Sequence, residues 1–327
     1  MGIFLNSAAP YSLYESEVKK PYFVDKSLML EELFLPAETG NSHICITRPR
    51  RFGKTVMANM VSAFFSRGVD STEIFSKLKI AGNTGYKKHL NTHDVIRIDF
   101  SRMPRNCNSY DKYIERIERI LIQDLMEAYP KAGIQEEDAV WDSLDLVYER
   151  YGGQRFIFVF DEWDCIFHKD FITDEDKKKY ISFLSSLLKY KAYVLLSYMT
   201  GILPIAKYSS GSELNMFAEY TMVSEEKFSD AFGFTEAEVD MLYARFLKNT
   251  GKPLLSRSGL KEWYDGYHAK GGERIYNPRS VVMALTNNNL GNYWTSSGPY
   301  DEIYYYIEKN VAGVRNDLAL MVSGESV

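Results

Sequence analysis

The chain has 327 residues, of which 45% are hydrophobic and 25% charged, and it carries a formal net charge of −5. This composition is ordinary for a folded domain and excludes wholesale disorder, and the acidic balance argues against a protein held on nucleic acid by bulk charge. Its three cysteines have no metal-type spacing, no secretory signal is evident and no apolar run approaches the ~20 residues of a membrane span, so we expect a cytoplasmic protein with no membrane contact.

Short apolar runs alternate with amphipathic patterns through the first two thirds of the chain. The apolar or alternating runs predict five strands, at residues 43–47, 94–100, 155–160, 192–200 and 220–223. The amphipathic patterns predict four helices between them, at 54–67, 111–129, 139–151 and 174–190. Because strands alternate with helices, we expect an α/β fold: a mainly parallel five-stranded sheet flanked by helices on both faces.

The last hundred residues carry helix-start signals instead. Thr235 and Glu238 have the spacing of a capping box, and Asn277 followed by Pro278 is typical of a second helix start. This region therefore favours a small helical domain. We divide the chain into an N-terminal segment that packs on the core (1–40), the core itself (41–224) and a smaller helical lid domain (225–327).

A loop with phosphate-binding character follows the strand at 43–47. It ends in Gly53-Lys54-Thr55 and leads into a helix, which matches the end of the pattern G-x-x-x-x-G-K-[ST]. In such loops the glycine lets the backbone approach a phosphate, the lysine reaches the β and γ phosphates, and the hydroxyl can ligate Mg²⁺. Arg48 stands where the pattern has its first glycine, so a polar turn capped by a threonine is the alternative. The predicted nucleotide-binding residues here are Pro49, Arg50, Arg51, Phe52, Gly53, Lys54, Thr55 and Val56.

Two adjacent acids end the strand at 155–160. In a P-loop ATPase the first acid holds Mg²⁺ through its water shell, and the second orients and polarises the water that attacks the γ-phosphate. We therefore assign Asp161, with Thr55, to the metal and Glu162 to catalysis. A buried strand with a solvated acidic end is the alternative. For the nearby Asp164, a loop or cap role is favoured over a third acid at the site.

Three further positions have weaker signals. Thr200 ends the strand at 192–200, where a polar side chain could sense the γ-phosphate, so we group it with Lys54 and Glu162 as catalytic; a turn residue is the alternative. Arg279 falls in the first turn of a predicted helix, where the dipole disfavours a cation and a bound phosphate would offset that cost. An exposed, unpaired arginine is the alternative there. For Arg50 and Arg51, phosphate contact competes with surface charge and with a role toward a neighbouring subunit.

Many short motifs occur in an order that resembles the prokaryotic AAA-ATPase-like family, across roughly residues 10–310. They are Tyr22-Phe23-Val24-Asp25-Lys26-Ser27, the loop at 48–55, Asp99-Phe100-Ser101, Phe160-Asp161-Glu162-Trp163-Asp164, Thr200-Gly201-Ile202-Leu203-Pro204-Ile205, Leu214-Asn215-Met216-Phe217 and Trp263-Tyr264-Asp265-Gly266-Tyr267. The arginine in place of the first loop glycine looks typical of that family. The resemblance implies a P-loop NTPase core of the additional-strand type with a helical lid, and ATP and Mg²⁺ as cofactors.

Members of that family often carry a C-terminal PD-(D/E)xK nuclease-like domain, for which we see no motif here. The E-x-K match at 225–227 favours a solvated helix start. We therefore expect Mg²⁺-dependent binding and hydrolysis of ATP that drives a switch between core and lid. The alternatives are a nucleotide-binding regulator with little hydrolysis, and the ATPase module of a nuclease-associated system that processes nucleic acid. Besides the nucleotide, a second copy of the chain, a nucleic acid and a nuclease are open as partners.

Overall fold

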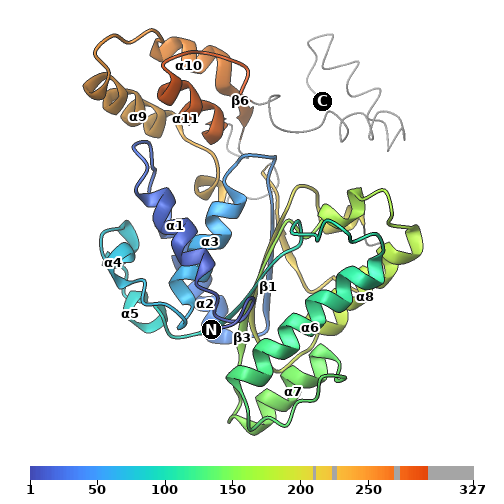
Figure 1. Ribbon diagram of the computed structural model, residues 1–327. Helices are drawn as coiled ribbons and strands as arrows, with labels where there is room; N and C mark the ends of the chain where they lie inside the picture. Colours follow the sequence, from blue (N-terminus) through green and yellow to red (C-terminus); the bar gives the residue numbers. More distant parts are fainter. Residues whose placement is uncertain (209–210, 223–226, 269–272, 294–327) are drawn as a thin grey trace.

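A five-stranded sheet forms the centre of the molecule (Figure 1) in the computed structural model, which describes residues 1–208, 211–222, 227–268 and 273–293. Its strands are β1 (Ser42–Thr47), β2 (Asp94–Asp99), β3 (Phe156–Asp161), β4 (Val194–Gly201) and β5 (Ala218–Tyr220). They lie in the order β2-β3-β4-β1-β5, and every neighbouring pair is parallel. The predicted sheet is thus confirmed. β4 lies between β1 and β3, as the additional-strand type requires.

Helices cover both faces of this sheet (Figure 1). One face carries α1 (Ala9–Val18), α2 (Glu31–Thr39), α3 (Lys54–Phe65), α4 (Thr72–Phe75) and α5 (Tyr86–His89), and the other carries α6 (Tyr110–Ala128), α7 (Val140–Arg150) and α8 (Asp174–Leu188). Short 3-10 helices are η1 (Ser27–Leu30), η2 (Lys79–Gly82), η3 (Cys165–His168), η4 (Ile205–Lys207) and η5 (Ser229–Ala231). The four helices predicted for this part are confirmed. Among the described residues, no helix is both long and apolar enough to cross a membrane.

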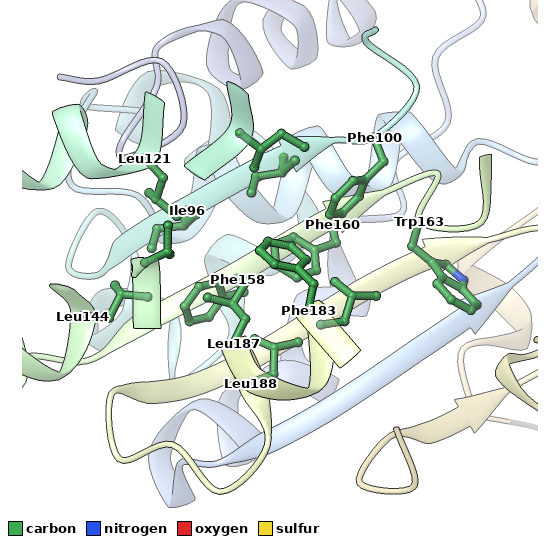
Figure 2. Close-up of a cluster of buried hydrophobic side chains, with 14 of the residues drawn as sticks. Ile96, Phe100, Leu121, Leu144, Phe158, Phe160, Trp163, Phe183, Leu187 and Leu188 are labelled. Atoms are coloured by element: carbon green, nitrogen blue, oxygen red, sulfur yellow. The ribbon is translucent and has the colours of Figure 1, made fainter. Parts of the chain in front are cut away.

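The alternation of side chains along β3 explains why both faces are covered. Ile157 and Val159 pack against the α3 side, whereas Phe158 and Phe160 pack against the α6–α8 side. Figure 2 shows the second cluster, in which the rings of Phe158 and Phe160 lie 5.8 Å apart. Trp163 is fully buried in it and packs with the core. The strand that carries the acids is therefore held rigidly from both sides.

The C-terminal part combines helices with a small sheet. It contains α9 (Glu236–Asn249), α10 (Arg257–Tyr264), α11 (Pro278–Asn287) and an antiparallel pair, β6 (Asp265–His268) and β7 (Arg274–Tyr276). The predicted capping box and the Asn277 cap are both present. The helical character expected of this region is present, and the short strand pair, in which Ile275 and Tyr276 are buried, is an addition that the helix-start signals did not indicate. Residues 225, 226, 269–272 and 294–327 of the predicted lid, and residue 223 of the predicted fifth strand, lie outside the described residues.

Candidate functional site

A cavity of about 1330 Å³ lies between the phosphate loop, the segment after β3, the N-terminal segment and the C-terminal helices. The predicted site residues that line it are Arg50, Arg51, Phe52, Gly53, Lys54, Thr55, Val56, Glu162 and Arg279. Pro49, Asp161 and Thr200 are not among its lining residues. The run Tyr22-Phe23-Val24 also lines it. Sequence reasoning gave these three residues no role at the site, because apolar and aromatic types indicate core as readily as a ligand.

The phosphate loop turns sharply before α3. Gly53 has φ 88°, in the left-handed region that only glycine enters at no cost, and a Cβ there would meet no atom within 4 Å. The backbone conformation, and not crowding, is thus what favours glycine at this position. Lys54, Thr55 and Val56 form the first turn of α3 and line the cavity. The positive end of the dipole of this 12-residue helix therefore faces the cavity and favours an anion there.

The ammonium group of Lys54 is bound within the loop. Its Nζ donates to the carbonyl oxygens of Arg48 (2.8 Å) and Pro49 (3.0 Å), and the residue is only 6% exposed. Burial lowers the pKa of Lys54, while the nearby carboxylates of Asp164 and Glu162 act in the opposite direction. The cation is thus held at the N-terminus of α3, close to the acids that follow β3.

Arg48, at the position of the missing glycine, is a structural residue. Its guanidinium donates to the carbonyl oxygens of Tyr220 (2.8 Å) and Phe228 (3.3 Å) and lies 5.1 Å from the ring centre of Phe232. The residue is 1% exposed, and burial lowers its pKa to about 10. The arginine therefore ties the loop to β5 and to the segment that leads to the C-terminal helices.

Asp161 is a buried acid whose two oxygens both have partners. Thr200 donates to its Oδ1 (2.7 Å) and Arg97 donates to its Oδ2 (3.2 Å). Arg97 lies on β2 and was missed by sequence reasoning. The only signal was a single arginine within an alternating strand, and its partner depends on the β2–β3 register, which pairs Asp99 with Asp161.

The next acid, Glu162, diverges from Asp161. Its φ of 50° lies in the left-handed region, so the chain bends where β3 ends, and the half-buried side chain lines the cavity. Burial raises the pKa of Glu162, and the charge of Asp161 adds to the effect. Asp164 accepts hydrogen bonds from the amides of Ile202 (2.8 Å) and Leu203 (3.1 Å), in keeping with a loop role, and it also lines the cavity.

Three arginines contribute positive charge to the cavity, two from the loop and one from the first turn of α11. Arg50, Arg51 and Arg279 all line the cavity. Burial lowers the pKa of Arg51, and the charges of Arg279 and Arg50 lower it further. The side chain of Arg51 donates to the carbonyl oxygen of Tyr293 (3.2 Å). Like charges held this close favour a polyanion in the cavity.

The residue types at this cavity fit a nucleoside triphosphate with Mg²⁺. Magnesium in such sites is bound by one or two protein oxygens together with phosphate oxygens and water. Thr55, which is exposed and lines the cavity, and Asp161, which is buried and does not line it, carry oxygens of the required type. The cations of the loop and of α11 match the phosphates.

A comparison with protein families agrees with the resemblance seen in the sequence motifs. The model of the AAA-ATPase-like family, described as "Predicted AAA-ATPase", matches residues 14–210. A curated relative from Azotobacter chroococcum mcd 1, called "Uncharacterized protein in vnfD 5'region", is 26% identical over 282 residues, which cover 85% of this chain and 51% of the relative. The chain therefore spans about half the length of that relative.

Two solved structures are similar at low identity. The Walker-type ATPase PABY2304 of Pyrococcus abyssi is 13% identical with a TM-score of 0.45, over 89% of this chain and 74% of that chain. The ORC2 protein of Aeropyrum pernix, in complexes with ADPNP and ADP, is 14% identical with a TM-score of 0.37, over 86% of this chain and 64% of that chain.

Proposed function

The chain belongs to the AAA-ATPase-like family of predicted AAA-ATPases, and from this premise we propose that it binds ATP with Mg²⁺ in the cavity at the phosphate loop and hydrolyses the ATP. The observation that carries the proposal is the meeting of the phosphate loop and Glu162 on one cavity. β1 and β3 both end there, and ligands of open α/β sheets bind at the carboxyl ends of the strands.

Binding rests on the loop and the first turn of α3. Lys54 exchanges its loop carbonyls for the β and γ phosphates, and the amides at the start of α3 face the same anion. Thr55 and Asp161 are the residues that hold Mg²⁺, whose charge offsets that of the phosphates. Arg97 and Thr200 fix the Asp161 carboxylate, so we propose that Thr200 acts through Asp161.

Glu162 serves the chemical step. Its carboxylate orients a water molecule and takes its proton as the water oxygen attacks the γ-phosphorus, and ADP leaves. The bend at Glu162 separates its carboxylate from that of Asp161, so the two acids can serve different partners. Arg279 brings the C-terminal helices into contact with the phosphates, which couples nucleotide binding to movement between core and lid.

Replacing Glu162 with Gln tests the proposal. The variant keeps size and hydrogen bonding but loses the basic carboxylate, so hydrolysis should fall by at least about a hundredfold while ATP affinity is unchanged. Asp170→Asn is the matched control, because Asp170 is an exposed acid that lines the same cavity. Equal hydrolysis rates in Glu162→Gln and wild type would show that another residue activates the water.

A nucleotide-binding regulator with little hydrolysis is the second candidate. It is favoured because Lys54 and Asp161 already form hydrogen bonds with other groups of the protein. A bound nucleotide with Mg²⁺ must displace or share these hydrogen bonds. Phosphate release under single-turnover conditions separates the two functions. Release within one binding event supports the ATPase, whereas tight ATP binding without release supports the regulator.

A further inference from the structure

A second, smaller cavity of about 140 Å³ lies at the β2 edge of the sheet. Its walls come from the first residues of the chain, α1, α3, β2 with the loop that follows it, and α6. It shares no lining residue with the cavity of about 1330 Å³ at the phosphate loop, in which we propose that ATP binds. Since one water molecule occupies roughly 30 Å³ in the liquid, the space exceeds the needs of a single bound water.

Two buried polar atoms on its lining residues have no hydrogen-bond partner in the part of the chain that the structure describes. They are Nε of Arg97 and Oδ1 of Asn59. Arg97 is 9% exposed and Asn59 is 4% exposed. A buried polar atom that lacks a partner is destabilising, so each such atom in a folded protein calls for an explanation. Here one atom is a donor and the other an acceptor.

The charges around this cavity do not balance. Arg97, Arg102 and Arg116 line it, against the single carboxylate of Asp99. Arg102 pairs with Asp99 at 3.0 Å, and Arg97 pairs through Nη2 with Asp161 at 3.2 Å. Within the described ranges, Arg116 forms neither an ion pair nor a hydrogen bond, although it is half-buried. One positive charge on the cavity wall is thus uncompensated.

From this arrangement we propose that the cavity binds a phosphate group, either free orthophosphate or a small phosphate monoester. Arginine side chains match phosphate geometry and remain charged at any physiological pH. Orthophosphate near neutral pH keeps one or two protons, so it can accept from Arg97 Nε and donate to Asn59 Oδ1. Sulfate has no proton to donate and lacks the second bond. The site lies in a different cavity from the proposed ATPase chemistry, and the one residue that the two share is Arg97, whose Nη2 pairs with Asp161.

The test uses the full chain with Lys54→Ala as background, because this change removes the cation expected to bind phosphate in the larger cavity. Orthophosphate, glycerol 3-phosphate and sulfate are titrated by calorimetry at constant ionic strength. Saturable binding of orthophosphate should persist in this background, with sulfate at least about tenfold weaker. Binding of glycerol 3-phosphate as well assigns the site to monoesters, and binding of orthophosphate alone assigns it to the free ion; either supports the proposal.

Two variants locate the binding. Arg116→Met removes the unpaired charge but keeps the stem, and should weaken phosphate binding about tenfold or more. Arg119→Met is the matched control, because Arg119 is exposed on the same helix and does not line the cavity. Asn59→Asp is an independent variant that places a negative charge on the wall, and it should weaken binding as strongly. Equal affinity in Arg116→Met and Arg119→Met, equal affinity for sulfate, or no saturable phosphate binding in the Lys54→Ala background would overturn the proposal.

Discussion

Lys54 is the residue on which nucleotide affinity should depend most. A charge-assisted contact to a buried anion contributes about 1.5–3 kcal/mol, so Lys54→Ala should weaken ATP binding about ten- to a hundredfold. Calorimetric titration measures this. Lys177→Ala is the control, since Lys177 lines the same cavity but forms an ion pair with Asp174, an exposed residue at the surface of the protein. Wild-type affinity in Lys54→Ala would contradict the phosphate-loop assignment.

The pH dependence of hydrolysis should report on Glu162. Burial and the charge of Asp161 raise the pKa of this carboxyl. Only the ionised form can take a proton from water, so activity should be present above the raised pKa and lost as the pH falls through it. Because kcat/KM reports the ionisation of the nucleotide-free protein, its acid limb should lie above about 4.3, the ordinary glutamate value. A limb at the ordinary value, with the chain shown to stay folded by circular dichroism, would count against the assignment.

At this scale the sequence predicts residue types better than it predicts their partners. Lys54, Thr55 and Glu162 follow from local patterns, and all three line one cavity. Arg97 did not follow, because a lone arginine in a strand gives no hint of the neighbouring strand or its register. The site roles themselves stay predictions until they are measured.

The contact between the phosphate loop and the β6–β7 pair links two elements distant in sequence. Phe52 is buried against Ile275, and its ring centre lies 4.7 Å from that of Tyr267. Gly233 fits beside them with φ 83°, and a Cβ there would lie 2.1 Å from Ile275 Cγ2. The loop conformation is therefore supported by the C-terminal part of the chain.

Removing the Phe52 ring should affect both stability and ATP binding. Phe→Ala substitutions in cores cost about 3–5 kcal/mol, and the loop would lose its support against β7. We expect Phe52→Ala to lower the free energy of unfolding in urea and to weaken ATP binding, and Phe52→Leu to do both to a smaller extent. If Phe52→Ala loses stability but keeps full ATP affinity, the contact serves packing alone.

Whole elements were predictable where their periodicity or caps were strong. The helix at α9 is an example, since Thr235 and Glu238 form the capping box that their spacing indicates. Helix α2 was missed because Pro36 lies inside it, which local rules disfavour and burial of Leu33 and Phe34 overrides. The β6–β7 pair was missed because its strands are short and their pairing is tertiary.

At the scale of the whole molecule, the N-terminal segment joins the core to the C-terminal helices. Val24 belongs to the hydrophobic cluster of α9, α10 and α11, and Lys26 pairs with Glu238 at 2.7 Å. Arg245 of α9 donates to the carbonyl oxygen of Pro21 at 2.7 Å. The division of the chain into three parts stays a prediction. Movement between these parts would have to break or rearrange the contacts described here.

Closure over the nucleotide is the prediction that belongs to this scale. Arg279, at the start of α11, lines the same cavity as Arg50 and Arg51, and the charges of Arg279 and Arg50 lower the pKa of Arg51, so these three cations repel one another. The phosphates of ATP neutralise this repulsion, so binding should draw the C-terminal helices toward the core. Small-angle scattering in the Glu162→Gln background, where turnover is suppressed, should show a smaller radius of gyration with ATP than without it. In the same background Arg279→Ala should weaken ATP binding about tenfold and reduce the compaction. Lys248→Ala removes an exposed charge from α9, away from the cavity, and should change neither quantity. A radius that stays constant at saturating ATP would show that the nucleotide binds without closing the molecule.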